Sequence, residues 1–293
     1  MKLLLTGAGG LLAREFSDLA PAAGHTLVAL PRAELDVTDA RAVHAALDRH
    51  RPDVVLNCAA YTAVDRAEAN ADAAFRVNRD GARYVAEAAA AYGAVMVHPG
   101  TDFVFDGRAR RPYRPDDPLA PLGVYGRSKA EGERAVLDAS SRHLVVRTSW
   151  LYGAGGRNFI SAILERAERG LPLRVVSDQR GRPTWARNLA GTILELLAVR
   201  PPVSGIWHAT DGGEATWLEL AREALALRGL DADIEPVSTE AWGAPAPRPP
   251  YSVLDVSATE ALLGRPMMPW RQALREFLDR LQAPPLRSAD GDA

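Results

Sequence analysis

Cysteine, excess charge and long hydrophobic runs are all scarce in this sequence, and each scarcity excludes a class of protein. The one cysteine, Cys58, lies in the apolar run DVVLNCAAY, so no intramolecular disulfide forms and we expect a small core residue in a reducing, cytoplasmic setting. With 35 basic and 37 acidic residues the net charge is -2, which argues against a basic surface for nucleic acid or a polybasic membrane segment. No hydrophobic run approaches the length needed to span a bilayer.

The chain has the composition of an ordinary globular protein. Its 293 residues are 47% hydrophobic and 25% charged, which is enough for one large core or two joined ones. The first residues lead directly into a strand-like segment, without the charged and apolar regions of a signal peptide. We therefore expect a soluble protein that binds neither nucleic acid nor membrane.

Short apolar segments alternate with Ala-rich helical segments through the first half of the chain. Because these segments are hydrophobic almost throughout, both faces of the sheet they form must be covered, which is typical of a parallel sheet with right-handed crossovers. The sequence therefore predicts an α/β fold with a Rossmann-like, doubly wound parallel sheet. The expected strands are KLLLT, TLVAL, DVVLNCA, AVMVHPG and HLVVRTS, at 2–6, 26–30, 53–59, 94–100 and 143–149.

The alternation loosens after Trp150, where we expect a smaller, discontinuous C-terminal lobe. Helical patterns occur at 160–170 and 216–229, a Pro-rich irregular stretch occupies 235–255, and a long helical pattern at 181–199 returns to the first sheet. The predicted division is 1–150 with 177–204 for the sheet domain, 151–176 and 205–282 for the small lobe, and 283–293 for a flexible tail.

A glycine-rich turn, LLLTGAGGLLAREF, follows the first expected strand. Gly7, Gly10 and Ala13 stand three apart at the entry to a helix, where small residues permit a tight turn and a close approach of the backbone to a pyrophosphate. An isolated match of this kind is often a plain strand-to-helix turn, but its place in an α/β chain favours a dinucleotide site. The residues expected at this turn to contact the cofactor are Gly7, Gly9, Gly10, Leu11 and Leu12.

The ends of the next two strands indicate which dinucleotide binds. The second strand is followed by Pro31 and Arg32 instead of the acidic residue that would bind ribose hydroxyls and repel a 2′-phosphate, which favours NADPH over NADH. Arg32 as a solvated surface residue is the alternative. Further expected cofactor contacts are Asp36 and Val37 at the adenine edge, and Ala59, Ala60 and Tyr61 after the third strand.

A hydroxyl residue, a tyrosine and a lysine occur together in the stretch from Thr101 to Val136. Tyr125 and Lys129 are four apart on an expected helix, so the ammonium lies near the phenol and also reaches the nicotinamide ribose. We expect this charge to lower the phenol pKa from its usual value near 10 and make Tyr125 a usable acid, while Thr101 polarises a carbonyl oxygen. Each residue alone is typical of a surface helix or a turn, but together they predict a site for ketone reduction.

Motifs along nearly the whole chain resemble an extended short-chain dehydrogenase/reductase, and most closely the dTDP-4-dehydrorhamnose reductase family. The resemblance implies a Rossmann domain, a small nucleotide-sugar lobe, and reduction of a dTDP-4-keto-6-deoxyhexose at C4 with NADPH or NADH. It leaves the oligomeric state open, with a homodimer among the options. The motifs are TGAGGLLA, LDVTD, NCAAYTAVDRAE, VNRDGARYVAEAA, TDFVFDG, PLGVYGRSKAEGE, VVRTSWLYG, NF, DQRGRPTWARNLA and RPPYSVLD.

The resemblance also implies roles for individual residues. Thr101, Tyr125 and Lys129 match the catalytic triad of the family, and Trp150 matches a tryptophan that lines the sugar pocket. No residue is assigned to a metal. The residues expected to contact substrate are Thr101, Asp102, Phe103, Tyr125 and Trp150, with weaker roles for Asn158, Arg187, Arg248 and Ser252.

The chain departs from the family pattern beside this triad. The family usually has Ser-Thr-Asp-Tyr where this sequence has Gly100 to Phe103, so a serine hydroxyl and a phenol beside the sugar are lost. Other 4-keto sugars, or a branched-sugar precursor in antibiotic pathways, are therefore alternative substrates. A related 4,6-dehydratase needs an acidic residue after Thr-Asp that is absent here, which disfavours dehydration.

Two other activities on the same fold remain as alternatives. A nucleotide-sugar epimerase uses the same triad with tightly held NAD, and Arg32 argues against it. A non-catalytic, nucleotide-binding regulatory subunit keeps the glycine turn while its triad decays, and the intact triad argues against it.

Overall fold

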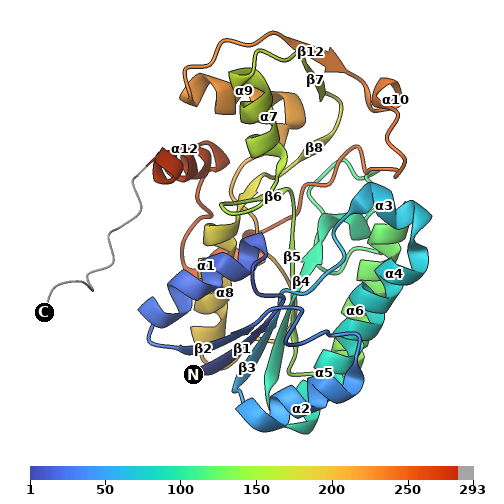
Figure 1. Ribbon diagram of the computed structural model, residues 1–293, viewed down its shortest axis with the longest axis vertical. Helices are drawn as coiled ribbons and strands as arrows, with labels where there is room; N and C mark the ends of the chain where they lie inside the picture. The colour runs from blue at the N-terminus through green and yellow to red at the C-terminus, as the bar shows by residue number, and fades with distance from the viewer. Residues whose placement is uncertain (283–293) are drawn as a thin grey trace, which may run out of the picture.

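A six-stranded parallel sheet forms the centre of the molecule in the computed structural model, which describes residues 1–282 (Figure 1). The strand order is β10-β5-β4-β3-β1-β2. The chain starts at β1 inside the sheet, adds β2 at one edge, and then adds β3, β4, β5 and β10 in turn on the other side of β1. This order confirms the predicted doubly wound fold. The strands are β1 (Lys2–Thr6), β2 (Thr26–Leu30), β3 (Val54–Asn57), β4 (Val95–Thr101), β5 (Leu144–Thr148) and β10 (Gly205–His208).

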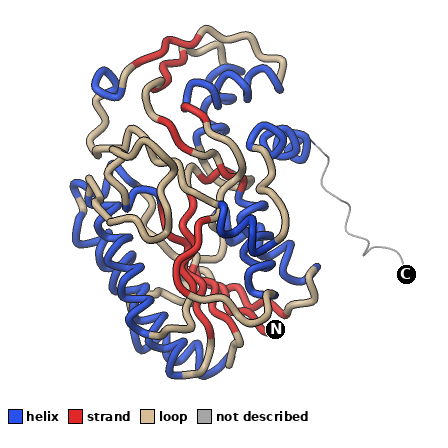
Figure 2. Tube along the Cα trace, turned by 180° about the vertical axis from the view of Figure 1, so that it is seen from behind, coloured by secondary structure: helices blue, strands red, loops and turns tan. Residues whose placement is uncertain are grey.

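Helices cover both faces of this sheet, as the nearly continuous hydrophobic strands require. Alternate side chains of β1 enter different cores, because Leu3 and Leu5 pack on the α1 and α8 side while Leu4 packs on the α2 and α5 side. Figures 1 and 2 show these helices as two layers with the sheet between them. The helices are α1 (Leu11–Ala22) and α8 (Ala186–Ala198) on one face, α2 (Ala40–His50), α5 (Ala82–Ala91) and α6 (Val124–Ala139) on the other, and α11 (Ser257–Leu263) against β10.

A helical segment between β3 and α5 packs tightly on α6. It consists of α3 (Val64–Ala69), α4 (Ala71–Phe75) and the π-helical turn η1 (Arg76–Gly81), which continues into α5. A Cβ on Gly132 of α6 would overlap the Asn78 carbonyl oxygen of η1. Glycine is therefore needed at this position for the two helices to pack.

The small lobe has a hydrophobic core of its own beyond the carboxyl ends of the strands, at the top of Figure 1. Tyr152 and Trp185 enter this core together with the apolar faces of three helices. The elements of the lobe are α7 (Phe159–Glu168), α9 (Trp217–Leu227), α10 (Thr239–Trp242), α12 (Trp270–Gln282), and the strand pairs β7 (Leu173–Val176) with β12 (Ile234–Val237), β8 (Arg180–Gly181) with β11 (Ala215–Thr216), and β6 (Leu151–Tyr152) with β9 (Thr184–Trp185).

The structure corrects parts of the predicted division. Residues 205–208 form β10 at the edge of the main sheet, paired with β5, although the sequence analysis assigned them to the small lobe. The pattern expected as one helix over 181–199 is a helix only from Ala186, after the short strands β8 and β9. The pair β7 and β12 was not predicted, because these short strands carry little periodicity of their own. The expected tail at 283–293 lies outside the described residues.

Within residues 1–282, none of the helices combines the length and the apolar character that crossing a membrane requires.

Gly132→Ala tests the close packing of α6 on η1. Since the new Cβ overlaps a backbone carbonyl oxygen, we expect a loss of about 1 to 3 kcal/mol in the free energy of unfolding, measured by urea denaturation. Gly191→Ala is the matched control, because its Cβ would meet nothing within 4 Å on helix α8, and alanine there should stabilise by about 0.5 to 1 kcal/mol. Equal effects of the two substitutions would contradict the packing argument.

Candidate functional site

A cavity of about 760 Å³ lies at the carboxyl ends of the central strands, where the sheet domain meets the small lobe. Open α/β sheets bind ligands at this edge, next to the point where the strand order reverses. The predicted residues that line the cavity are Gly7, Gly10, Leu11, Leu12, Arg32, Asp36, Val37, Ala59, Ala60, Tyr61, Thr101, Asp102, Phe103, Tyr125, Lys129, Trp150, Asn158 and Arg248.

The glycine-rich turn forms one end of this cavity. Gly7 has a φ of 68°, and a Cβ there would lie 2.7 Å from the Ala59 nitrogen, so only glycine fits. Gly9 also has a positive φ, of 100°, and serves the turn without lining the cavity. Helix α1 begins after Gly10 with no side-chain cap and no acidic residue in its first turn. Its first N–H groups are therefore free to bind an anion such as a pyrophosphate.

A carboxylate accompanies Arg32 at the end of β2. Arg32 lies with its side chain 81% exposed, and its Nη2 is 3.3 Å from Asp36 Oδ2. Hydrogen bonds from the Thr38 backbone and hydroxyl lower the pKa of Asp36, so this carboxyl is ionised at neutral pH. The sequence analysis expected Asp36 only at the adenine edge and did not foresee its ion pair with Arg32.

The three residues of the predicted triad line the same wall of the cavity. Thr101 ends β4, and α6 begins at Val124, which brings Tyr125 and Lys129 to this wall on the first turns of the helix. Thr101 and Lys129 are 6% and 3% exposed, and Tyr125 is half-buried. The Lys129 ammonium donates to the Pro99 carbonyl oxygen at 2.7 Å and lies 3.1 Å from His98 Nε2.

The expected effect of Lys129 on the phenol is not found. Burial raises the pKa of Tyr125 to about 12, and the Thr101 hydroxyl opposes this rise only in part. Burial also lowers the pKa of Lys129 to about 8. The phenol therefore stays protonated at neutral pH, which is the state that a proton donor needs.

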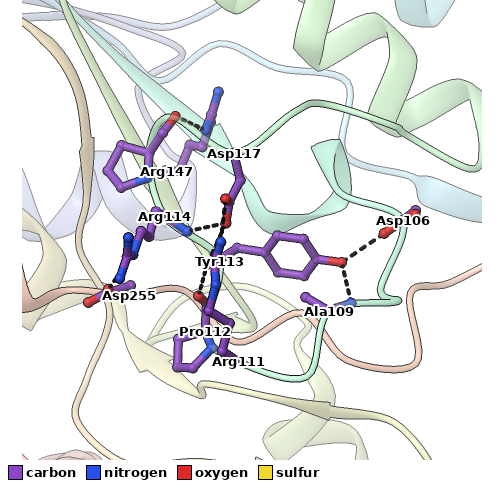
Figure 3. A network of polar contacts seen from close by, with 10 residues as sticks. Asp106, Ala109, Arg111, Pro112, Tyr113, Arg114, Asp117, Arg147 and Asp255 are labelled. Atoms are coloured by element: carbon purple, nitrogen blue, oxygen red, sulfur yellow. Dashed lines mark hydrogen bonds and ion pairs between the residues drawn. The ribbon is translucent and has the colours of Figure 1, made fainter.

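A polar network holds the loop between Thr101 and Tyr125 (Figure 3). The Tyr113 hydroxyl donates to Asp106 Oδ1 at 2.8 Å and accepts from the Ala109 nitrogen at 3.1 Å. Arg111 binds both carboxylate oxygens of Asp117, at 2.8 and 2.7 Å. These contacts hold a proline-rich segment that has no α-helix or long strand, and so help to fix the distance between Thr101 and Tyr125 at its two ends.

Comparison with known proteins agrees with this arrangement. The sequence matches the family described as RmlD substrate binding domain over residues 1–283. The chain belongs to the RmlD substrate binding domain family.

Individual members of the RmlD family are similar over almost the whole chain. A protein of Streptomyces antibioticus named probable dTDP-4,6-dihydroxy-2-methyloxan-3-one 4-ketoreductase is 46% identical, covering 98% of this chain and 99% of its own. The dTDP-4-dehydrorhamnose reductase of Streptomyces griseus is also 46% identical, covering 95% and 93%. The crystal structure of dTDP-4-dehydrorhamnose reductase from Bacillus anthracis in complex with NADP is 33% identical, with a TM-score of 0.91 and coverage of 95% and 99%.

An aromatic cluster lines the cavity on the side of the small lobe. The Trp150 indole stacks on Trp217 with ring centroids 3.6 Å apart, and Phe159 is tilted against Trp217 at 4.6 Å. Trp150 has a φ of 47°, and a Cβ on Gly181 would lie 2.5 Å from its ring. The sequence analysis did not assign Trp217 or Phe159 to the site. Each is an aromatic residue at the start of a predicted helix, in a chain with only 6% aromatic residues, and this could have marked them as candidates.

The structure does not bring Arg187 to the cavity. Its guanidinium pairs with Glu15 at 3.0 Å and with Asp18 at 3.7 Å, on the α1 and α8 side of the sheet. The implied substrate role of Arg187 is therefore withdrawn, because its ion pairs join two helices outside the site. Gly9 and Ser252 also do not line the cavity.

Two other predicted substrate residues line the cavity but have structural partners as well. Asn158 caps α7 by accepting from the Ser161 nitrogen at 3.1 Å. Arg248 donates to Asp65 at 3.0 Å. Both side chains thus hold the rim of the cavity whether or not they touch a ligand.

Asp102 is a buried carboxyl with an unsatisfied oxygen. It is 2% exposed, it accepts from Thr101 Oγ1 at 3.2 Å, and its Oδ2 has no hydrogen-bond partner within the described residues. Burial raises its pKa to about 7, although the nearby Ser252 and Thr101 hydroxyls oppose the rise. Its free oxygen makes Asp102 a candidate contact for a ligand hydroxyl.

Asp102→Asn should change how stability depends on pH. Between about pH 4 and 7 the folded carboxyl keeps a proton that the unfolded chain releases, so its contribution to stability falls as pH rises, by at most about 1.4 kcal/mol per pH unit. We expect the free energy of unfolding of the variant to gain on the wild type from pH 5 to pH 7, measured by urea denaturation. The exposed Asp116→Asn is the control, and a constant difference between Asp102→Asn and wild type would contradict this pKa.

Proposed function

We propose that the protein is an NADPH-dependent reductase that converts the C4 ketone of a dTDP-4-keto-6-deoxyhexose into an alcohol. One observation carries the proposal: Thr101, Tyr125 and Lys129 share a wall of the cavity whose other end is the open N-terminus of α1. The relatives named above as 4-ketoreductase and dTDP-4-dehydrorhamnose reductase support the substrate class. The reaction belongs in the cytoplasm on this proposal, which agrees with the single cysteine.

The glycine turn fits the cofactor for two reasons. The absence of a Cβ at Gly7 lets the turn lie against the Ala59 backbone, and the first N–H groups of α1 have no side-chain cap. When bound, NADPH supplies the hydride. We assign the pyrophosphate to Gly10, Leu11 and Leu12, because helix N-termini favour anions.

Arg32 supports the choice of NADPH. Its exposed guanidinium lines the cavity, and within residues 1–282 Asp36 is its one ion-pair partner. Exposed pairs of this kind contribute little free energy. A 2′-phosphate can therefore replace Asp36 as the ion-pair partner of Arg32. The Bacillus anthracis relative crystallised with NADP is consistent with this choice.

The chain's own groups account for the proton chemistry. The Thr101 hydroxyl and the Tyr125 phenol bind the substrate carbonyl oxygen, and Tyr125 gives its proton to that oxygen as the alcohol forms. Burial keeps this proton on the phenol until the oxygen becomes basic. The Lys129 ammonium lies one helical turn away on the same wall, and we assign it to the nicotinamide ribose and, once the cofactor is bound, to the phenolate that remains.

The proposed function is tested by following NADPH oxidation in purified protein given several dTDP-4-keto sugars, with NADH in parallel and product stereochemistry determined. We expect oxidation with at least one sugar and faster turnover with NADPH. No oxidation with any sugar, or tightly retained NAD with interconversion of sugars, would refute a reductase.

Tyr125→Phe removes the proposed proton donor and little else. We expect kcat to fall by about 10² to 10⁴-fold, while NADPH binding, measured by fluorescence titration, persists. Tyr84→Phe on α5 is the matched control, since Tyr84 lies outside the cavity. Near-normal turnover of Tyr125→Phe would exclude Tyr125 as the acid.

Phe103 is the proposed determinant of which sugar is preferred. Its ring meets Tyr125 edge-on with centroids 5.6 Å apart, and it lines the cavity where most of the family has a phenol. An apolar wall discriminates weakly against an added hydroxyl, whereas a polar wall rejects a substrate that lacks its partner. We therefore infer that this protein tolerates deoxygenated 4-keto sugars better than a tyrosine-bearing relative does.

Phe103→Tyr should shift preference toward the fully hydroxylated sugar. We expect the ratio of kcat/KM for dTDP-4-keto-rhamnose over a more deoxygenated analogue to rise by about tenfold, the effect of one hydrogen bond. Phe75→Tyr on α4, outside the cavity, is the control. An unchanged ratio would mean that Phe103 only packs against Tyr125.

A further inference from the structure

Three neighbouring strands of the sheet, β1, β3 and β4, carry buried polar side chains that form a row across it. Thr6 on β1, Asn57 on β3 and His98 on β4 are 0%, 2% and 1% exposed. Thr6 Oγ1 lies 2.6 Å from Asn57 Oδ1, and Asn57 Nδ2 lies 3.3 Å from His98 Nδ1. Buried polar groups cost free energy unless they are paired, so each member of the row depends on the next.

The row ends at the Lys129 ammonium. His98 Nε2 lies 3.1 Å from Lys129 Nζ, and the Pro99 carbonyl oxygen accepts from the same nitrogen at 2.7 Å. These are its two hydrogen-bond partners among residues 1–282. An ammonium has three N–H groups, so one remains for the cavity that Lys129 lines.

We propose that His98 is a positioning residue that acts through Lys129. Its neutral Nε2 accepts a hydrogen bond from the ammonium, and together with the Pro99 carbonyl it directs the third N–H into the cavity. This inference rests on the proposed reductase function, in which that N–H serves the cofactor ribose and the phenol.

The contact fixes the tautomer of His98. An ammonium has no lone pair, so Nε2 must be unprotonated and the ring proton must lie on Nδ1, facing Asn57. The Asn57 amide must then present its oxygen to His98 and its NH₂ to Thr6, which is the reverse of the orientation described above. The two amide orientations have nearly the same shape, so a rotation of the amide group by half a turn is enough. Because an amide does not titrate, the row holds Lys129 in place and does not conduct protons.

The groups around Lys129 determine what losing His98 would do. Burial, with the charge of Lys129, lowers the pKa of His98 well below its usual value, so the ring stays neutral. Glu133 on α6 and Cys58 after β3 also lie near the ammonium, and Tyr125 lies one turn earlier on α6. Removing the His98 acceptor leaves these groups in place, removes one contact that favours the charged form, and so lowers the pKa of Lys129.

The kinetic test compares His98→Leu with His98→Gln, whose amide oxygen can accept at the Nε2 position. In His98→Leu we expect the alkaline limb of kcat/KM to move about one pH unit lower and KM for NADPH to rise about tenfold, as for one lost bond to a charged group. His98→Gln should recover part of both changes. His143→Leu is the control: this buried histidine contacts the Met96 nitrogen and the Ala86 oxygen, away from Lys129, so it should lower Tm without moving the limb.

The spectroscopic test needs neither a substrate nor a stable leucine variant. With ¹⁵N-histidine labelling, the imidazole resonances of His98 are those present in wild type and absent from His98→Gln. At pH 7 their chemical shifts should show that the ring proton is on Nδ1. An Nε2–H tautomer at pH 7, or a folded His98→Leu with the wild-type limb and KM, would overturn the proposal. A protein that oxidises no NADPH would refute the reductase function but would leave the tautomer result intact, so the two failures are distinguishable.

Discussion

The buried ion pair between Arg147 and Glu133 fixes the helix that carries Tyr125 and Lys129. Arg147 of β5 and Glu133 of α6 have side chains 1% and 2% exposed, with Nε and Oε2 2.9 Å apart. The same guanidinium donates to the Pro115 carbonyl oxygen at 3.1 Å and lies over the Phe105 ring. One side chain thus joins the sheet, the helix and the loop shown in Figure 3. Loss of either partner would leave a buried charge, at a cost of about 3 to 5 kcal/mol.

Close packing around this ion pair depends on residues without side chains. A Cβ on Gly100 of β4 would overlap the Glu133 carboxylate, and one on Gly126 of α6 would overlap the Phe103 carbonyl oxygen. Glycine at position 100, where the family usually has serine, is therefore compatible with Glu133 in this position. A serine at position 100 would direct its side chain at the ion pair and not into the cavity, so this departure makes room for Glu133 and removes no hydroxyl from the site.

The site combines a polar wall with an aromatic one. Thr101 and Lys129 are buried, and hydrogen bonds to Pro99 and His98 hold the ammonium in place, which is the fixed geometry that the proposed ketone reduction requires. The opposite wall consists of Trp150, Trp217 and Phe159 in aromatic contact. Such a wall contributes area and shape without many hydrogen bonds, which suits a sugar with few hydroxyl groups.

The sequence by itself determined the sheet, its parallel strands, the glycine turn and the four-residue spacing of Tyr125 and Lys129. These features are local, since hydrophobic runs, glycines and helical periodicity act over a few residues. It did not determine that β10 joins the main sheet or that Arg187 pairs with Glu15. It also missed the Asp36 partner of Arg32, the stack of Trp150 on Trp217, and the phenol pKa. Only the tertiary structure decided these, because burial and long-range contacts depend on which segments meet, and no local pattern encodes that.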